Sequence, residues 1–177
     1  EKKELTILFS DLRGFTALSE KLPPEKIVEI LNEHLEAMSQ IILQHKGTID
    51  KFMGDGIMAI FGAPIYYESH ALRAIKVALE MQKAQEKLSQ KWAKLGIKTN
   101  IGIGINTGDV VIGNIGSHQR TDYTAIGDVV NVASRLCGVA EQGEILVSER
   151  TYNDTKKVAS FGKSVPMKIK GKAKSLS

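Results

Sequence analysis

Residues 47–62 constrain the fold more than any other stretch, because they form the pattern strand, tight turn, strand. Apolar and β-branched residues flank the centre, Gly54-Asp55-Gly56, on both sides. That arrangement is a sequence signal for a β-hairpin. The second arm, residues 57–61, is apolar on both faces, as in a strand buried under helices. The hairpin therefore places a carboxylate, that of Asp55, at a buried bend, and Lys51 precedes it by four residues.

A second acidic residue ends the first predicted strand. Residues 5–10 form a continuous strand pattern, and Asp11, Gly14 and the opening of a helix follow. A carboxylate in this position suits Mg²⁺, which prefers oxygen ligands. The free N–H groups at a helix start bind phosphate oxygens. Two such acids on neighbouring strands predict a two-metal site with the ions roughly 3.5–4 Å apart.

Four sequence blocks follow one another in a specific order. They are FSDLRGFT at residues 9–16, DKFMGDG at 50–56, GIGINTG at 102–108 and YTAIGDVVNVASR at 123–135. Together they resemble the catalytic domain of class III nucleotide cyclases. Any one block is weakly diagnostic, whereas all four in this order are highly specific. The resemblance runs from about Leu5 to Lys172, nearly the whole chain.

The predicted elements alternate between strand and helix early in the chain and pair as hairpins later. Apolar spacings of three and four predict long helices that follow Pro24 and His70. A strand is predicted over residues 98–105, a turn over 106–109 and a second hairpin arm over 110–116. The remaining predicted elements are a helix over 128–140 and strands over 144–147, 158–161 and 165–169. This order is α+β, with one mostly antiparallel sheet covered by helices. The resemblance implies a ferredoxin-like βαββαβ core.

Length and composition fit one globular domain. The chain has 177 residues and a net charge of +4, and no run approaches the ~18 apolar residues of a membrane span. The single cysteine, Cys137, excludes an internal disulfide and reads as a core residue. His34 and His45 read as surface residues rather than metal ligands. The lysines near the end read as solvated, so no nucleic-acid partner is predicted.

We expect residues 1–177 to form one catalytic domain, a fragment of a longer multidomain protein. The expected location of the catalytic domain is cytoplasmic. This expectation also holds for a full-length protein that is attached to a membrane. Upstream sensory or regulatory domains are the expected partners in the full-length chain.

The resemblance implies an adenylate cyclase that converts ATP to 3',5'-cyclic AMP and pyrophosphate. The ribose 3'-hydroxyl attacks the α-phosphate of the same nucleotide. In this interpretation Asp11 and Asp55 hold two Mg²⁺ or Mn²⁺ ions, and the Leu12 carbonyl completes one metal shell. The β- and γ-phosphates lie on the backbone amides of Gly14, Phe15 and Thr16.

The resemblance also implies that a partner subunit completes each site. Asn131 positions the ribose, and Arg135 meets the charge that develops at the α-phosphate. Lys172 contacts the terminal phosphates, with Lys170 as the alternative, and Arg120 adds a further phosphate contact. Because one chain carries both halves of the site, two identical chains are expected to form a homodimer with two shared active sites.

Lys51 and Thr124 are the residues expected to read the base. A lysine donates and cannot accept a hydrogen bond, which suits N1 of adenine, and the threonine hydroxyl can accept from the 6-amino group. Guanylyl-specific relatives resemble this chain but carry glutamate and often cysteine at these places. The threonine resembles a subgroup of adenylyl cyclases often stimulated by bicarbonate.

Three alternatives stay open at this point. The first is a guanylate cyclase. The second is a non-catalytic nucleotide-sensing dimerisation domain that kept the fold. The third is a relative of diguanylate cyclases or polymerase palms, which lack the Asn131 and Arg135 helix pair.

Overall fold

A computed structural model of the chain describes residues 1–159, 161–166 and 172–176, with side chains described up to residue 159. Its strands are β1 (Lys2–Arg13), β2 (Thr48–Met53), β3 (Gly56–Phe61), β4 (Asn100–Gly116), β5 (Thr121–Ile126), β6 (Ile145–Ser148), β7 (Phe161–Pro166) and β8 (Lys172–Leu176). Its helices are α1 (Phe15–Ser19), α2 (Pro24–Gln44), α3 (His70–Ala93), α4 (Asp128–Val139) and α5 (Glu149–Thr155). Within the described residues, no helix is long and apolar enough to cross a membrane.

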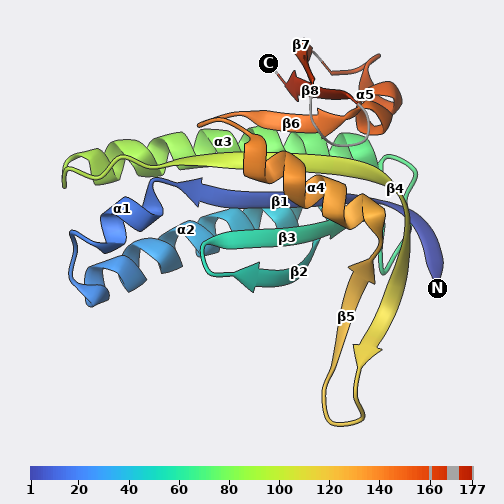
Figure 1. Ribbon diagram of the computed structural model, residues 1–177, viewed down its shortest axis with the longest axis horizontal. Coiled ribbons are helices and arrows are strands. Elements are labelled where there is room, and N and C mark those ends of the chain that lie inside the picture. The colour runs from blue at the N-terminus through green and yellow to red at the C-terminus, as the bar shows by residue number, and fades with distance from the viewer. Residues whose placement is uncertain (160, 167–171, 177) are drawn as a thin grey trace.

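The strands form one sheet in the order β2-β3-β1-β4-β6-β8-β7, and β5 pairs with β4 outside this path. The pairs β1–β3, β1–β4 and β2–β3 are antiparallel, whereas β4–β6 is parallel. The first four strands with α2 and α3 between them reproduce the βαββαβ order of the ferredoxin-like core (Figure 1). The predicted α+β class is confirmed.

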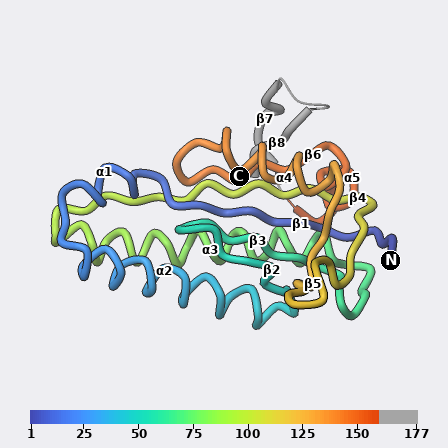
Figure 2. The backbone as a smooth tube through the Cα atoms, turned by 60° about the horizontal axis from the view of Figure 1, so that its bottom comes forward, coloured from blue at the N-terminus to red at the C-terminus, as the bar shows by residue number. Residues whose placement is uncertain are grey.

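Helices cover both faces of the central sheet (Figure 2). Successive strand side chains point to opposite faces, so β1 contributes to two separate cores. Leu8 packs in one cluster with Met38 of α2 and Ile75 of α3. Ile7 packs in another cluster with Ala133 of α4. The sheet thus lies between α2 and α3 on one face and α4 on the other.

The first predicted hairpin is confirmed. β2 and β3 are joined by a tight turn in which Gly54 has a φ of 63°, a left-handed conformation that glycine adopts without a steric penalty. Every residue of β3 is buried, as the apolar pattern predicts.

The predicted turn at residues 106–109 is wrong, because β4 runs unbroken through it. Asn106 pairs with Ile7, and the neighbouring strand β1 supplies partners for the whole segment. A Cβ on Gly108 would lie only 2.7 Å from a methyl carbon of Val129, so a glycine here lets α4 pack closely on the strand. These small and polar residues therefore serve helix packing rather than a turn.

The second hairpin lies further along the chain than predicted. It joins β4 to β5, and the Ser117 and Arg120 backbones close its turn with N–H to carbonyl distances of 2.8 and 3.2 Å. Figure 1 shows this hairpin projecting away from the helices.

The last strands also differ from the prediction. The segment from Val158 follows the turn at the end of α5, where the Val158 amide donates to Thr155, and β7 begins only at Phe161. The strand predicted over 165–169 overlaps β7 at its first two positions, and residues 167–169 lie outside the described residues.

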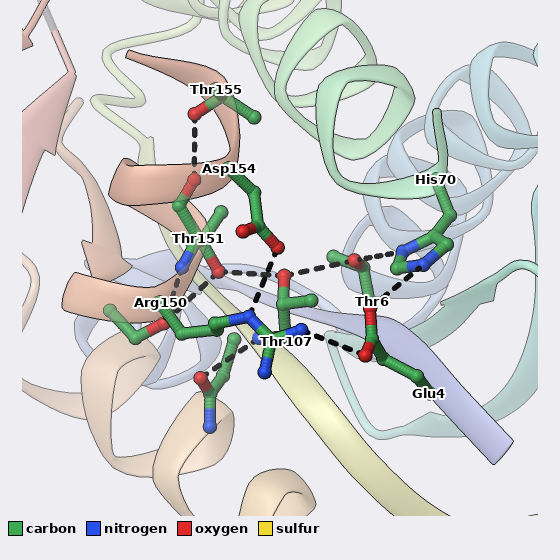
Figure 3. Close-up of polar contacts among 10 residues, drawn as sticks. Glu4, Thr6, His70, Thr107, Arg150, Thr151, Asp154 and Thr155 are labelled. Carbon is green, nitrogen blue, oxygen red and sulfur yellow. Dashed lines mark hydrogen bonds and ion pairs between the residues drawn. The ribbon is translucent and has the colours of Figure 1, made fainter. Parts of the chain in front are cut away.

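A buried hydroxyl network fixes α3 and α5 to the sheet (Figure 3). The Thr6 hydroxyl lies 2.7 Å from His70 Nδ1 and 3.0 Å from the Thr107 hydroxyl. The Thr107 hydroxyl lies 2.9 Å from that of Thr151 on α5. Because buried polar groups are costly without partners, this network stabilises one placement of the two helices.

His34 is a buried residue, so the prediction that it lies on the surface is wrong. Its Nδ1 lies 2.8 Å from Gln85 Oε1, and its Nε2 has no hydrogen-bond partner among the described residues. An amide oxygen only accepts, so Nδ1 carries the proton. Burial lowers the pKa of His34 to about 4, although the bond to Gln85 opposes this shift.

We expect the free energy of unfolding to fall as the pH drops from about 6.5 to about 4. In this window the unfolded chain, with a His34 pKa of 6.5, binds a proton that the folded chain excludes until about pH 4. The loss should reach about 3 kcal/mol from this residue. His70 adds a loss of the same sign, because burial lowers its pKa too. Urea unfolding at a series of pH values measures the effect.

The substitution His34→Gln should flatten much of this slope. His118→Gln is the matched control, since His118 is exposed in the β4–β5 turn, and it should keep the slope. An unchanged slope in His34→Gln would show that the buried imidazole is not the titrating group.

Candidate active site

The two predicted metal-binding carboxylates lie at one end of the central strands. The register pairs Ser10 of β1 with Ile57 of β3, which puts Asp11 next to the turn that carries Asp55. A Cβ built on Gly56 would lie 3.8 Å from the Cβ of Asp11. The β1–β3 pairing therefore brings together two acids that are 44 positions apart in the sequence.

Asp55 is half-buried, and its surroundings act on its charge in both directions. Desolvation raises the pKa of Asp55, while the Leu12 backbone N–H and the Arg13 guanidinium act to lower it. The N–H and C=O of one strand residue point to the same side of the strand. The Leu12 carbonyl is therefore directed toward Asp55, where the predicted third ligand has to lie.

Arg13 is a site residue that the sequence reasoning missed. Its guanidinium donates to the Asp11 carboxylate and to the Cys137 carbonyl, and it reaches the Ala140 carbonyl at 3.0 Å. A Cβ on Gly102 would overlap this guanidinium, so the glycine makes room for it. The arginine thus links the strand of the metal site to the C-terminal end of α4. Its place two residues after the acid was the available signal.

The residues present fit divalent ions that arrive with a nucleotide. Among the described residues there is no group of three or more His, Cys, Asp or Glu side chains able to hold a metal by itself. Mg²⁺ is usually held by one or two carboxylates together with substrate phosphates, rather than by an all-protein cage. Asp11, Asp55 and the Leu12 carbonyl supply that smaller set.

The predicted phosphate loop lies directly after these ligands. Gly14 has a φ of 84° and precedes α1, a conformation that favours glycine. The first amides of a helix have no partner within the helix, so the N–H groups of Phe15 and Thr16 are available to a ligand. They follow Asp11 in the chain by four and five residues. The contact of these amides with phosphates stays a prediction.

The two predicted base-reading residues meet at Asp50, a residue that the sequence reasoning did not select. The Thr124 hydroxyl donates to Asp50 Oδ2 at 2.6 Å, and the Ala125 N–H reaches the same oxygen at 3.4 Å. The Lys51 ammonium lies 3.7 Å from Asp50 Oδ1. The Lys51 ammonium from β2 and the Thr124 hydroxyl from β5 therefore both lie next to the Asp50 carboxylate.

The residues expected to serve a partner subunit are exposed. Asn131 and Arg135 lie on α4, on the opposite side of the helix from buried Ala133 and Cys137. No described contact joins either of them to Asp11 or Asp55 of the same chain. Exposure of this kind is what a site completed by a second subunit requires.

The remaining predicted phosphate ligands are less well placed. Arg120 lies at the tip of the β4–β5 hairpin, 3.9 Å from Asp122, with a side chain that is 86% exposed. Lys172 begins β8, and its side chain is not among those described. Lys170 lies outside the described residues.

The chain is similar to known proteins over its whole length. The family model described as adenylate and guanylate cyclase catalytic domain matches residues 1–177. The adenylate cyclase of Anabaena cylindrica is 38% identical over 187 residues, an alignment that covers 99% of this chain and 36% of that protein. The chain spans 27% to 36% of the length of the first curated relatives it matches.

Two crystal structures, of an adenylyl and a guanylyl cyclase, have nearly the same fold as this chain. The adenylyl cyclase CyaB from P. aeruginosa has a TM-score of 0.93 and 40% identity, covering 100% of this chain and 95% of that one. The guanylyl cyclase Cya2 has the same TM-score and identity, covering 99% and 92%. Since an adenylyl and a guanylyl cyclase match equally well, the choice of nucleotide has to be argued from side chains.

Proposed function

This chain belongs to the adenylate and guanylate cyclase catalytic domain family, and from that premise we propose that it is an adenylate cyclase. ATP would be converted to 3',5'-cyclic AMP and pyrophosphate. The observation that carries the choice of adenine is the pairing of Lys51 and Thr124 on Asp50. N1 of adenine accepts a hydrogen bond and its 6-amino group donates one, so a lysine and a hydroxyl acceptor complement it. Guanine has a protonated N1, which a lysine cannot accept from.

The chain's own groups would orient ATP for an in-line attack. The Gly14, Phe15 and Thr16 amides bind the β- and γ-phosphates, which leaves the α-phosphate beside Asp11 and Asp55. Asp11, Asp55 and the Leu12 carbonyl would hold two Mg²⁺ or Mn²⁺ ions. Such ions, when bound, activate the ribose 3'-hydroxyl and neutralise charge on the phosphates.

A second copy of the chain would complete each site. Its Asn131 would hold the ribose, its Arg135 would stabilise charge at the α-phosphate, and its Lys172 would bind the terminal phosphates. The exposure of Asn131 and Arg135 supports this homodimer. Two-fold symmetry then makes two equivalent sites.

The remaining predictions stay predictions. They are the single-domain boundaries, the upstream regulatory domains, the cytoplasmic location, stimulation by bicarbonate and the phosphate contact of Arg120.

Exchange of the base-reading residues tests the proposed nucleotide. We expect the unsubstituted protein to prefer ATP over GTP, and Lys51→Glu combined with Thr124→Cys to weaken ATP use and raise GTP use. Glutamate accepts from the guanine N1–H and 2-amino group, and it repels N1 of adenine. Chromatography of the products from Mn-ATP and Mn-GTP measures both activities. If the double variant discriminates against GTP as strongly as the parent, the base is read elsewhere.

A further inference from the structure

We propose that Asp50 is a specificity-determining positioning residue, which makes the Thr124 hydroxyl an obligate hydrogen-bond acceptor toward the base. The inference rests on the proposed function, since it concerns how the same site tells adenine from guanine. Its observation is the contact between the Asp50 carboxylate and the Thr124 hydroxyl, buried between β2 and β5.

The direction of this hydrogen bond follows from the chemistry of its two partners. An ionised carboxylate has no proton to donate, so the Thr124 hydroxyl must donate to Asp50. The oxygen–oxygen distance of 2.6 Å is in the range of a charge-assisted O–H···O⁻ bond. The Asp50 side chain is only 1% exposed, and Thr124 is buried, so water does not compete for this proton.

The strand that carries Asp50 is built to bury it. The β2–β3 register shifts between Ile49 and Lys51, which makes Asp50 the extra residue of a β-bulge. A bulge redirects side chains relative to a regular strand. Here the bulge coincides with a buried Asp50 side chain, while the neighbouring Lys51 side chain is 48% exposed. The Lys51 side chain can therefore reach a ligand, whereas the Asp50 carboxylate contacts only other groups of the protein, such as the Thr124 hydroxyl.

The remaining contacts hold the carboxylate in place. The Ala125 N–H supports the oxygen that accepts from Thr124, at 3.4 Å. The other oxygen, Oδ1, has no hydrogen-bond partner among the described residues and lies 3.7 Å from the Lys51 ammonium. The Lys51 ammonium therefore lies on the side of the carboxylate opposite to the oxygen that accepts from Thr124.

A threonine hydroxyl is by itself a weak discriminator between purines. It can accept from the 6-amino group of adenine, or it can rotate and donate to O6 of guanine. Once its proton is committed to Asp50, only its lone pairs face the base. Guanine O6 then meets a second acceptor, and this repulsive contact provides specificity against GTP. Asp50 thereby converts a permissive hydroxyl into a selective one.

The test is the ratio of kcat/KM for ATP to kcat/KM for GTP. We expect Asp50→Ala to lower this ratio roughly tenfold, the worth of about one hydrogen bond. Asp50→Asn keeps the shape of the side chain and retains a weaker acceptor, so a smaller fall in the same direction is expected. A merely structural defect lowers both kcat/KM values together and leaves the ratio unchanged. Titration calorimetry with non-cyclisable ATP and GTP analogues gives a second readout that needs no turnover.

Two comparisons isolate the proposed role. In a Thr124→Val background, which lacks the hydroxyl, Asp50→Ala should leave the ratio unchanged. Asp109→Ala removes an exposed aspartate of β4, and its ATP-to-GTP ratio should equal that of the parent. The inference is overturned if both Asp50 variants keep the parent ratio in turnover and in binding, or if the ratio falls equally without the Thr124 hydroxyl.

The same measurements separate this inference from the proposed function. A parent protein that makes neither cyclic nucleotide overturns the proposed function and this inference with it. A parent that prefers ATP, with Asp50 variants that keep that preference, overturns this inference alone.

Discussion

Replacing Asp11 or Asp55 with asparagine is expected to reduce cyclic AMP formation to below a few per cent of the parent level, in Mg²⁺ and in Mn²⁺. The β1–β3 register brings Asp11 next to the turn that carries Asp55, and among the described residues there is no group of three or more His, Cys, Asp or Glu side chains that could hold a metal instead. Losing one anionic ligand removes several kcal/mol of charge stabilisation at the phosphates, and each 1.4 kcal/mol is a factor of ten in rate.

The fold should survive both substitutions. An asparagine at position 11 can still accept from Arg13, which preserves the link to α4. At position 55 the amide avoids the desolvation of a half-buried carboxylate, the largest contribution to the raised pKa of Asp55. Thermal unfolding checks stability, and Asp109→Asn, at an exposed position of β4, is the matched control that should keep activity. Turnover above a few per cent in either site variant, with either metal, contradicts the two-metal assignment.

An equal mixture of Asp11→Ala and Arg135→Ala subunits is expected to recover about a quarter of the parent activity. Each variant alone should be inactive, because each removes one half of both sites. A mixed dimer combines both defects in one site and leaves the other site intact. With random exchange at equal amounts, about half the dimers are mixed and each has one good site of two. Co-expression with two different affinity tags allows mixed dimers to be purified, and these should show about half of the parent activity.

A second mixture provides the control for this design. Asp11→Ala and Asp55→Ala affect the same half of the site, so every site of their mixed dimer keeps one defect. That mixture should stay inactive, which distinguishes complementation from simple dilution of a damaged subunit. If confirmed mixed dimers of Asp11→Ala and Arg135→Ala are also inactive, each site is built within one chain and the shared architecture is wrong.

Much of the fold was predictable because local chemistry and period agree along the chain. The glycines around Asp55 predicted a turn, and the apolar residues after it predicted a buried strand. The apolar spacing of three and four residues after Pro24 predicted a helix, and all three elements are present. Asp11 and Asp55 could be selected as a pair because each follows a strand and precedes a turn or helix. Asn131 and Arg135 were selected from a resemblance, and their exposure on α4 agrees with the role it implies.

Other features depend on which segments meet in space, and a one-dimensional pattern does not contain that information. Residues 106–109 have the composition of a turn, yet β1 pairs with them and α4 packs on Gly108, so they continue a strand. The sequence pattern predicts an exposed His34 on its helix, but in the structure α3 packs against it and Gln85 forms a hydrogen bond with it.

The site shows the same division. The sequence by itself determined the two acids and the glycine and helix start that follow Asp11, because these depend on residue type and local geometry. The candidate base-reading pair was selected from the family resemblance. Only the tertiary structure decided that Arg13 bridges Asp11 to the end of α4, and that Asp50 receives the proton of Thr124. Both contacts join residues more than 70 positions apart. The direction of a hydrogen bond depends on the partner that packing supplies, and for Thr124 that partner is a buried carboxylate on another strand.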